Sequence, residues 1–224
     1  MPSFSYVDIA GARGVEGAVV VVDVLRAFTT AAWAIQLGAT EIVLVADLDE
    51  ALAFKAAHPG SLAFCDGSAK EGFDLHNSPV QLLSLDVAGR RIAQRTGHGT
   101  QGVVAAAGAS PLLCASFVVA GATVRHLAGA RAEHVTFVVT GGEEDQACAE
   151  YIAGLLGGGP PDLSALARAR SSPAAIDLME KGADDTYTGV DPADVDMCLE
   201  LDRFAFTLEV TDIDGRQVLR GLSG

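Results

Sequence analysis

Short apolar runs alternate with helical patterns along this chain. Residues 18–22 (AVVVV) form a continuous, valine-rich run, as expected of a strand buried on both faces, and the run stops at Asp23. From Arg26 onward, apolar residues recur at three- and four-residue spacing until Gly38, which predicts a helix with a glycine stop. A strand that leads directly into a helix is typical of a βαβ unit and a parallel sheet.

The same alternation predicts the other elements. An edge strand is expected near residues 4–9, and further strands at 40–46, 61–65, 91–96, 111–115, 134–139 and 204–210. Helices are expected after Asp47 and from Pro79, at 118–127, 163–169 and 173–181, and from Asp191 through Leu201, and the apolar run from Cys148 to Leu156 predicts another. Asp214-Gly215 predicts a hairpin that returns along residues 217–220.

We therefore expect an α/β fold of three layers, with a largely parallel or mixed sheet, helices on both faces, and a C-terminal helix and β-hairpin. Residues 1–156 are expected to form the α/β core that carries the cleft loops. Residues 157–224 begin with a GGGPPD linker and are expected to form a helical cover and the hairpin, within the same compact unit.

Composition and charge limit the classes of function. The chain has 224 residues, is 50% hydrophobic and has a mean hydropathy of +0.32, which suits one large domain or two lobes that share a core. Its apolar runs are too short to span a bilayer and no basic-then-apolar leader opens it, so we expect a cytoplasmic protein. The cysteines lack zinc-ligand spacing and are expected to be buried in a reducing compartment; they are Cys65, Cys114, Cys148 and Cys198.

The chain is strongly acidic. Its net charge of -14 and pI near 4.6 argue against nucleic acid and anionic membranes as partners, because no basic stripe exists to neutralise phosphates. An acidic protein that handles an anionic small molecule needs local positive charge from a metal ion, an arginine or helix N-termini.

Polar or glycine-rich loops follow several of the predicted strands. Asp23 and Arg26 stand between a strand and a helix N-terminus, whose free amides favour anions. Residues 66–79 (DGSAKEGFDLHNSP) form a long loop rich in potential ligands. Similar loops follow at residues 96–102, at Ser116 and at residues 140–145. We expect all these loops on one edge of the sheet, where open α/β folds bind ligands.

Each loop also has an interpretation without function. Asp23 can cap a helix, with Arg26 at the surface. Asn77 and Ser78 can cap the helix that follows them, and the acids at 143–145 can be favourable residues of a first helical turn.

The hexapeptide GHGTQG, residues 97–102, matches the GxGxxG pattern of dinucleotide-binding loops. The match is weak because the strand at 111–115 leads into Ser116 and Phe117 rather than into an acidic residue that would hold a ribose. The same glycines suit a phosphate or sulfonate, or a purely structural turn. A nucleotide-dependent oxidoreductase or transferase is therefore one alternative, and an acidic α/β module that binds an anionic metabolite without catalysis is another.

Several motifs together resemble the ComB family of 2-phosphosulfolactate phosphatases. The resemblance lies in VVVVDVLRAFTTAAWAIQLGA, EGFDLHNSP, the TGHGT turn, ASFVVAGATV, GGEEDQACAEYIAGLL and LELDRFAFTLEV, in the family's order. It implies an α/β enzyme that uses Mg2+ to hydrolyse a phosphate monoester of a small sulfonated hydroxy acid, in a route to coenzyme M. The chain departs from the family pattern at His76, where glycine is more usual, at His98, where asparagine is more usual, and in a shortened acidic loop at 141–145.

The resemblance and the loops together give a candidate metal site. Phosphoryl transfer needs charge neutralisation on the non-bridging oxygens, which Mg2+ held by one or two carboxylates provides. Asp23, Glu71 and Asp145 are the candidate Mg2+ ligands or water activators, with Asp74 and Glu144 in reserve.

The remaining candidates bind or protonate the substrate. Arg26 would bind phosphate or sulfonate bidentately, and His98 would protonate the leaving alkoxide. The candidate substrate-binding set is completed by Thr29, Asp74, Asn77, Ser78, Gly99, Thr100 and Ser116.

The sequence leaves two mechanisms open, attack on phosphorus by a metal-bound water and formation of a phospho-enzyme at Asp23. Asp23→Asn and Arg26→Ala are predicted to keep the fold while slowing turnover, and a homodimer is the default assembly.

Overall fold

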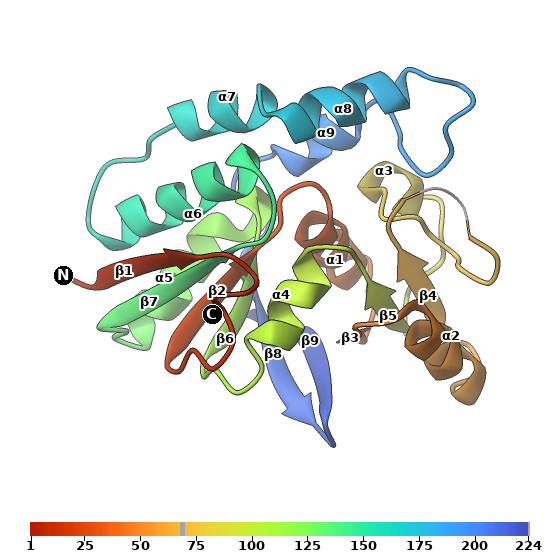
Figure 1. The fold of residues 1–224 in the computed structure, drawn as a ribbon, viewed down its shortest axis with the longest axis horizontal. Helices are drawn as coiled ribbons and strands as arrows, with labels where there is room; N and C mark the ends of the chain where they lie inside the picture. Colours follow the sequence, from red (N-terminus) through yellow and green to blue (C-terminus); the bar gives the residue numbers. More distant parts are fainter. Residues whose placement is uncertain (68–69, 224) are drawn as a thin grey trace.

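The computed structural model describes residues 1–67 and 70–223, and within these ranges the strands join into one nine-stranded sheet (Figure 1). In spatial order the strands are β1 (Ser3–Val7), β7 (His134–Val139), β2 (Ala18–Val22), β6 (Leu112–Ala115), β8 (Phe206–Ile213), β9 (Arg216–Ser223), β3 (Glu41–Leu44), β5 (Arg91–Arg95) and β4 (Leu62–Cys65). Helices cover both faces of this sheet, which confirms the predicted three-layer α/β fold.

The sheet consists of two parallel halves joined by an antiparallel hairpin. β1, β7, β2 and β6 run parallel to one another, and so do β3, β5 and β4. β8 pairs antiparallel with β6, and β9 pairs antiparallel with both β8 and β3. The predicted hairpin is confirmed, but it lies at the centre of the sheet, because its partners are strands far away in the sequence.

The expectation that all cleft loops lie on one edge of a parallel sheet is wrong. Three antiparallel pairings, β6 with β8, β8 with β9 and β9 with β3, separate the two parallel halves, so the halves run in opposite senses. Five strand steps separate β2 from β5, and a twist of about 20–25° per step turns them by roughly 100–125°. The carboxyl ends of the two halves therefore converge, and the amide of Gly99, after β5, donates to Asp23, after β2, at 2.8 Å.

The valine run is buried on both faces, as predicted. In β2, Val19 and Val21 face one core cluster, while Val20 and Val22 face the other. The first cluster includes residues of α1 (Ala27–Gln36), α3 (Pro79–Leu82), α4 (Gly99–Ala105) and η1 (Phe117–Val119). The second includes α5 (Ala120–Gly129) and α6 (Glu143–Leu156), and a smaller cluster lies under α2 (Leu48–Ala57).

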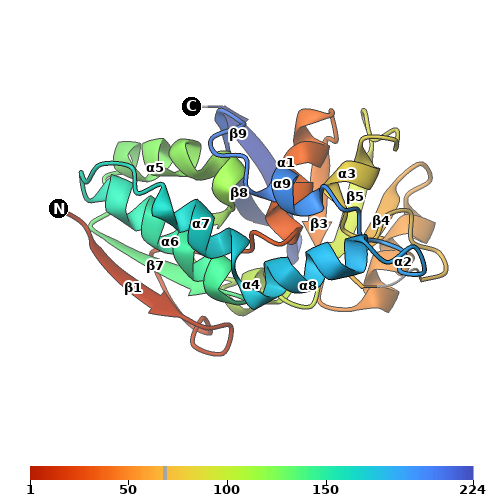
Figure 2. The same cartoon turned by 90° about the horizontal axis from the view of Figure 1, so that it is seen from above.

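Three short helices lie in residues 157–224, the segment expected to cover the cleft. They are α7 (Ser164–Arg170), α8 (Pro173–Gly182) and α9 (Asp194–Cys198), and Figure 2 shows α7 and α8 following one another along the molecule. The helix predicted from Asp191 through Leu201 is shorter, because the Asp191 carboxylate accepts a hydrogen bond from the amide of Ala193 and closes a turn before the helix begins.

The cysteines are buried and free, as predicted; they are Cys65, Cys114, Cys148 and Cys198. None of the helices in the described ranges has the length and apolar character that crossing a bilayer would need.

Candidate functional site

A cavity of about 480 Å³ lies between the converging strand ends and α8. Of the predicted site residues, it brings together Asp23, Arg26, Asn77, His98 and Asp145, with Glu144 beside them. The predicted residues that lie outside its lining are Thr29, Glu71, Asp74, Ser78, Gly99, Thr100 and Ser116. Residues of the lining that the sequence did not single out for binding include Asp66, Asp177, Lys181 and Tyr187.

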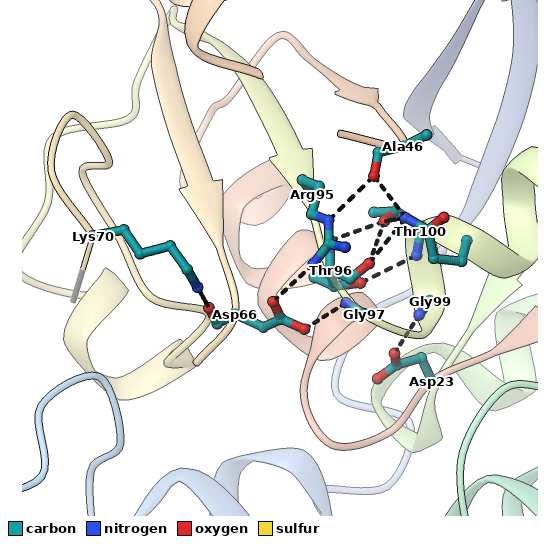
Figure 3. Close-up of polar contacts among 10 residues, drawn as sticks. Asp23, Ala46, Asp66, Lys70, Arg95, Thr96, Gly97, Gly99 and Thr100 are labelled. Carbon is teal, nitrogen blue, oxygen red and sulfur yellow. Dashed lines mark hydrogen bonds and ion pairs between the residues drawn. The ribbon is translucent and has the colours of Figure 1, made fainter. Parts of the chain in front are cut away.

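The TGHGT turn is held from both sides by carboxylates that follow different strands (Figure 3). Asp23 accepts from the amide of Gly99 at 2.8 Å, and Asp66 accepts from the amide of Gly97. Between these two anchored amides, His98 is exposed and its side chain lines the cavity. The Gly99 amide, expected to bind a substrate anion, therefore already has a carboxylate partner.

The glycines of GHGTQG serve close packing. A Cβ atom at Gly99 would lie 2.7 Å from Asp23 Oδ2, and one at Gly102 would lie 2.7 Å from both Val21 Cγ1 and Thr140 Cγ2. Either contact is closer than real side chains allow, so α4 approaches the ends of β2 and β7 only with glycine at both positions. The GxGxxG match has a structural explanation in this fold.

Three buried carboxylates form the acidic wall of the cavity, which we define as Asp23, Glu144 and Asp145. Asp23 also accepts from the amide of Ala27 at 3.0 Å, so it caps α1 as the alternative interpretation proposed. Asp145 accepts from the amide of Val24 at 2.7 Å and thereby ties the start of α6 to the loop after β2.

Glu144 is the least satisfied member of the acidic wall. Its Oε1 accepts from the amide of Gly142 at 3.2 Å, whereas its Oε2 is buried and has no hydrogen-bond partner within the described residues. None of the three acidic-wall carboxylates forms an ion pair in the part of the chain that the structure describes.

Burial and the charges of neighbouring carboxylates raise the pKa of Asp23 and of Asp145. Burial raises the pKa of Asp23 to about 6, and the charge of Glu144 adds to this, while the amides of Ala27 and Gly99 and the nearby His98 oppose it. The pKa of Asp145 is raised well above its ordinary value, mainly by burial and then by the charges of Asp23 and Glu144. A cation placed among these groups would offset both the burial and the repulsion.

The donor chemistry of the acidic wall fits Mg2+. Among residues 1–67 and 70–223, no three His, Cys, Asp or Glu side chains already converge as a ready metal cage. Mg2+ does not need one, because it keeps several waters and is usually bound through one or two carboxylates and a substrate phosphate. The unpartnered Oε2 of Glu144 and the two raised carboxyl pKa values suit such an ion.

Arg26 is held by the protein itself. Its Nη1 donates to Asp194 Oδ2 at 2.6 Å and to the carbonyl of Gly189 at 2.8 Å, and its Nη2 donates to the carbonyl of His76 at 3.4 Å. Asp194 is fully buried and also accepts from the Ser78 hydroxyl at 2.6 Å. Most of the guanidinium expected to bind substrate is therefore committed to a structural ion pair.

Asp194 is a residue that sequence reasoning missed. It lies 168 positions from Arg26, in the cover helix α9, and only the tertiary fold brings the two together. In the sequence, Asp194 stands out only as one of several acids at 191–196, at the start of the helix predicted from Asp191.

The 66–79 loop contributes less to the cavity than predicted. Asp74 pairs with Lys55 at 2.8 Å and accepts from the amide of Ala63, so it anchors the loop outside the cavity, while Glu71 is exposed. Ser78 accepts from the amide of Gln81 at 3.1 Å, which confirms the capping interpretation.

Four other predicted substrate-binding residues have polar atoms whose hydrogen bonds can be followed in the structure. Asn77 lines the cavity, and its Oδ1 accepts from Gln94 at 3.3 Å. The Thr29 hydroxyl donates to the carbonyl of Val24, and Thr100 exchanges hydrogen bonds with Thr96. The Ser116 hydroxyl is buried without a described partner.

Comparison with known proteins identifies the family. The sequence model of the 2-phosphosulpholactate phosphatase family matches residues 6–212. Proteins named probable 2-phosphosulfolactate phosphatase are similar to the chain. The one from Bacillus subtilis is 34% identical over 62% of this chain and 64% of the relative, and the one from Synechocystis is 36% identical over 61% of each. These matches span less than two thirds of those relatives' length, whereas one from Prochlorococcus marinus (strain MIT 9313), 33% identical, covers 84% of this chain and 86% of the relative. The chain belongs to the 2-phosphosulpholactate phosphatase family.

Proposed function

We propose that this chain hydrolyses 2-phosphosulfolactate to sulfolactate and inorganic phosphate, with Mg2+ as cofactor. The observation that carries the proposal is the uncompensated acidic wall beside a cavity, in a chain of this family. An acidic wall repels a phosphorylated acid unless a cation lies between them, so the same observation supports the cofactor and the anionic substrate.

Asp23, Glu144 and Asp145 are the residues that would hold the ion. When bound, Mg2+ supplies positive charge that neutralises the non-bridging oxygens of the phosphate. Both oxygens of Asp23 accept backbone amides, from Ala27 and Gly99, and this favours an anchoring role over attack on phosphorus. Water is therefore the proposed nucleophile.

His98 is the proposed proton donor. It lines the cavity from an exposed position at the start of α4, where a substrate can reach its ring. The oxygen of water forms the new bond to phosphorus, the bond from phosphorus to the ester oxygen breaks, and the His98 proton passes to that oxygen. One proton of the attacking water stays on the phosphate, and the other is released and replaces the proton that His98 gave up. Histidine suits this role because its ordinary pKa lies near neutrality.

The first experiment is phosphate release from 2-phosphosulfolactate and a panel of phosphorylated hydroxy acids, with Mg2+ and with EDTA. We expect release that requires Mg2+ and is fastest with the sulfonated substrate. Release that is equally fast in EDTA would contradict the metal requirement, and no release from any substrate would favour the non-catalytic anion-binding alternative.

The variant Asp23→Asn tests the acidic wall directly. Turnover is expected to fall by about 10²- to 10⁴-fold, because charge stabilisation of the transition state is lost. Asp162→Asn, a change to an exposed carboxylate ahead of α7, is the matched control and is expected to keep the wild-type rate. Equal rates in the two variants would contradict the assignment.

The family resemblance also suggests a place in a route to coenzyme M, which we propose for the reaction product. A cytoplasmic location and a homodimer stay predictions.

A further inference from the structure

The cavity has a second wall opposite in character to the acidic wall. It is formed by α8 and the loop after it, and contributes Ala174, Asp177, Leu178, Lys181, Tyr187 and Val190. Lys181 is its cationic residue, and Arg26 lines the same cavity.

The interactions of the Lys181 ammonium within the protein are weak. Its ammonium pairs with Asp177 on the same helix at 2.6 Å and lies 5.5 Å from the ring centre of Tyr187. The side chains of Lys181 and Asp177 are 38% and 56% exposed, and an ion pair so exposed contributes little to stability. A ligand anion can therefore replace Asp177 as the partner of Lys181, whereas Arg26 is already committed to buried Asp194.

We propose that Lys181 binds the sulfonate of the substrate and so determines specificity for sulfonated over plain phosphorylated hydroxy acids. This inference rests on the proposed function, in which the phosphate lies at the acidic wall. A compact ammonium with three donors suits a head group with three equivalent oxygens, while the planar guanidinium fork suits a carboxylate. Lys181 comes from α8, whereas the proposed metal ligands follow β2 and begin α6, so different elements would hold the two anionic ends of the substrate.

The kinetic test compares Lys181→Gln with the wild type on 2-phosphosulfolactate and on 2-phospholactate, which lacks only the sulfonate. The KM for the sulfonated substrate is expected to rise about 10- to 30-fold, as for loss of a charge-assisted hydrogen bond, with kcat within about twofold. The KM for 2-phospholactate is expected to stay within about twofold of the wild-type value. Equal effects on both substrates, or none on either, would overturn the proposal.

Two further variants separate recognition from general effects of charge. Arg168→Gln removes a positive charge from the neighbouring helix α7, where Arg168 pairs with Glu150, and is expected to leave both KM values unchanged. Asp177→Asn removes the competitor for Lys181 and is expected to lower the KM for the sulfonated substrate about two- to threefold. A rise in that KM would contradict the exchange of partners.

A binding measurement distinguishes failure of this inference from failure of the proposed function. Calorimetry with sulfolactate and with lactate, in Mg2+, needs no turnover. Binding of sulfolactate that Lys181→Gln weakens about tenfold or more, with lactate unaffected, supports the inference even if no substrate is hydrolysed. Sulfolactate binding that is equal in both proteins, or absent from the wild type, overturns it.

Discussion

Two clusters of buried charge each contribute residues to the lining of one cavity, and they differ in whether the protein supplies a partner of opposite charge. Arg26 and Asp194 are 5% and 0% exposed and neutralise each other through a 2.6 Å contact. The acidic wall is equally buried, yet its carboxylates meet amides and one another rather than a cation of the described chain. The fold itself satisfies the first cluster, whereas the second has no cationic partner among the described residues.

The largest expected effect comes from breaking the satisfied cluster. Asp194→Ala leaves Arg26 charged and buried without its partner, and also removes the acceptor of the Ser78 hydroxyl. The free energy of unfolding is expected to fall by about 3–5 kcal/mol, measured by urea denaturation. The same reasoning now predicts that Arg26→Ala also destabilises the fold, contrary to the expectation from sequence.

A matched control is Asp196→Asn on the same helix, where an exposed pair with Arg170 is expected to contribute less than about 1 kcal/mol. The double variant Arg26→Met with Asp194→Leu removes both charges and is expected to recover much of the loss. A loss below about 1 kcal/mol in Asp194→Ala would mean that the pair is not the structural cluster we describe.

The acidic wall predicts that the free energy of unfolding, measured in EDTA, depends on pH. Burial raises the pKa of Asp23 from 3.8 to about 6. Between about pH 4 and about pH 6 the Asp23 carboxyl is therefore protonated in the folded state but ionised in the unfolded state. Stability is therefore expected to fall as pH rises from about 4 to about 6, by on the order of 3 kcal/mol, since about two pKa units correspond to about 1.4 kcal/mol each. Urea denaturation across this range should show a flatter profile in Asp23→Asn. Parallel profiles would contradict the raised pKa.

Adding Mg2+ is expected to stabilise the folded protein through the acidic wall. An ion that binds only the folded state at about 100 times its Kd raises the free energy of unfolding by about 2.7 kcal/mol. Thermal or urea denaturation at matched ionic strength measures this without any turnover. The gain should shrink in Glu144→Gln and persist in Glu143→Gln, because Glu143 is the exposed neighbour outside the cavity. Equal gains in the two variants would place the ion elsewhere.

Much of the fold followed from local pattern. The valine run at 18–22 is buried, the strand at 134–139 was predicted with the bounds that the structure has, and the helical run from Cys148 to Leu156 lies within α6. These elements depend on residues near one another in sequence, so periodicity and caps are sufficient to find them. The central place of β8 and β9 depends on pairing with β6 and β3, which no local pattern records.

The site was predictable only in part, for the same reason. Asp23, His98 and Asp145 each follow a strand end or begin a helix, and such positions can be read from sequence. Whether a charged residue faces a cavity or a buried partner depends on distant segments. Arg26 was therefore identified as a site residue but assigned to substrate, whereas it pairs with Asp194. Lys181 was not singled out, since its helix reaches the cavity only through the tertiary fold.

The smallest expected effect concerns Glu71, which the sequence grouped with Asp23 and Asp145 but which is exposed and outside the cavity lining. Water and salt screen a charge in such a position, so Glu71→Gln is expected to change kcat and KM by no more than about twofold. Glu144→Gln, the same chemical change inside the acidic wall, should raise the Mg2+ concentration needed for half-maximal rate by about tenfold, because it removes the unpartnered oxygen. If Glu71→Gln instead lost tenfold or more in kcat/KM while unfolding normally in urea, the placement of Glu71 outside the site would be wrong, and with it the division between the acidic wall and the exposed acids.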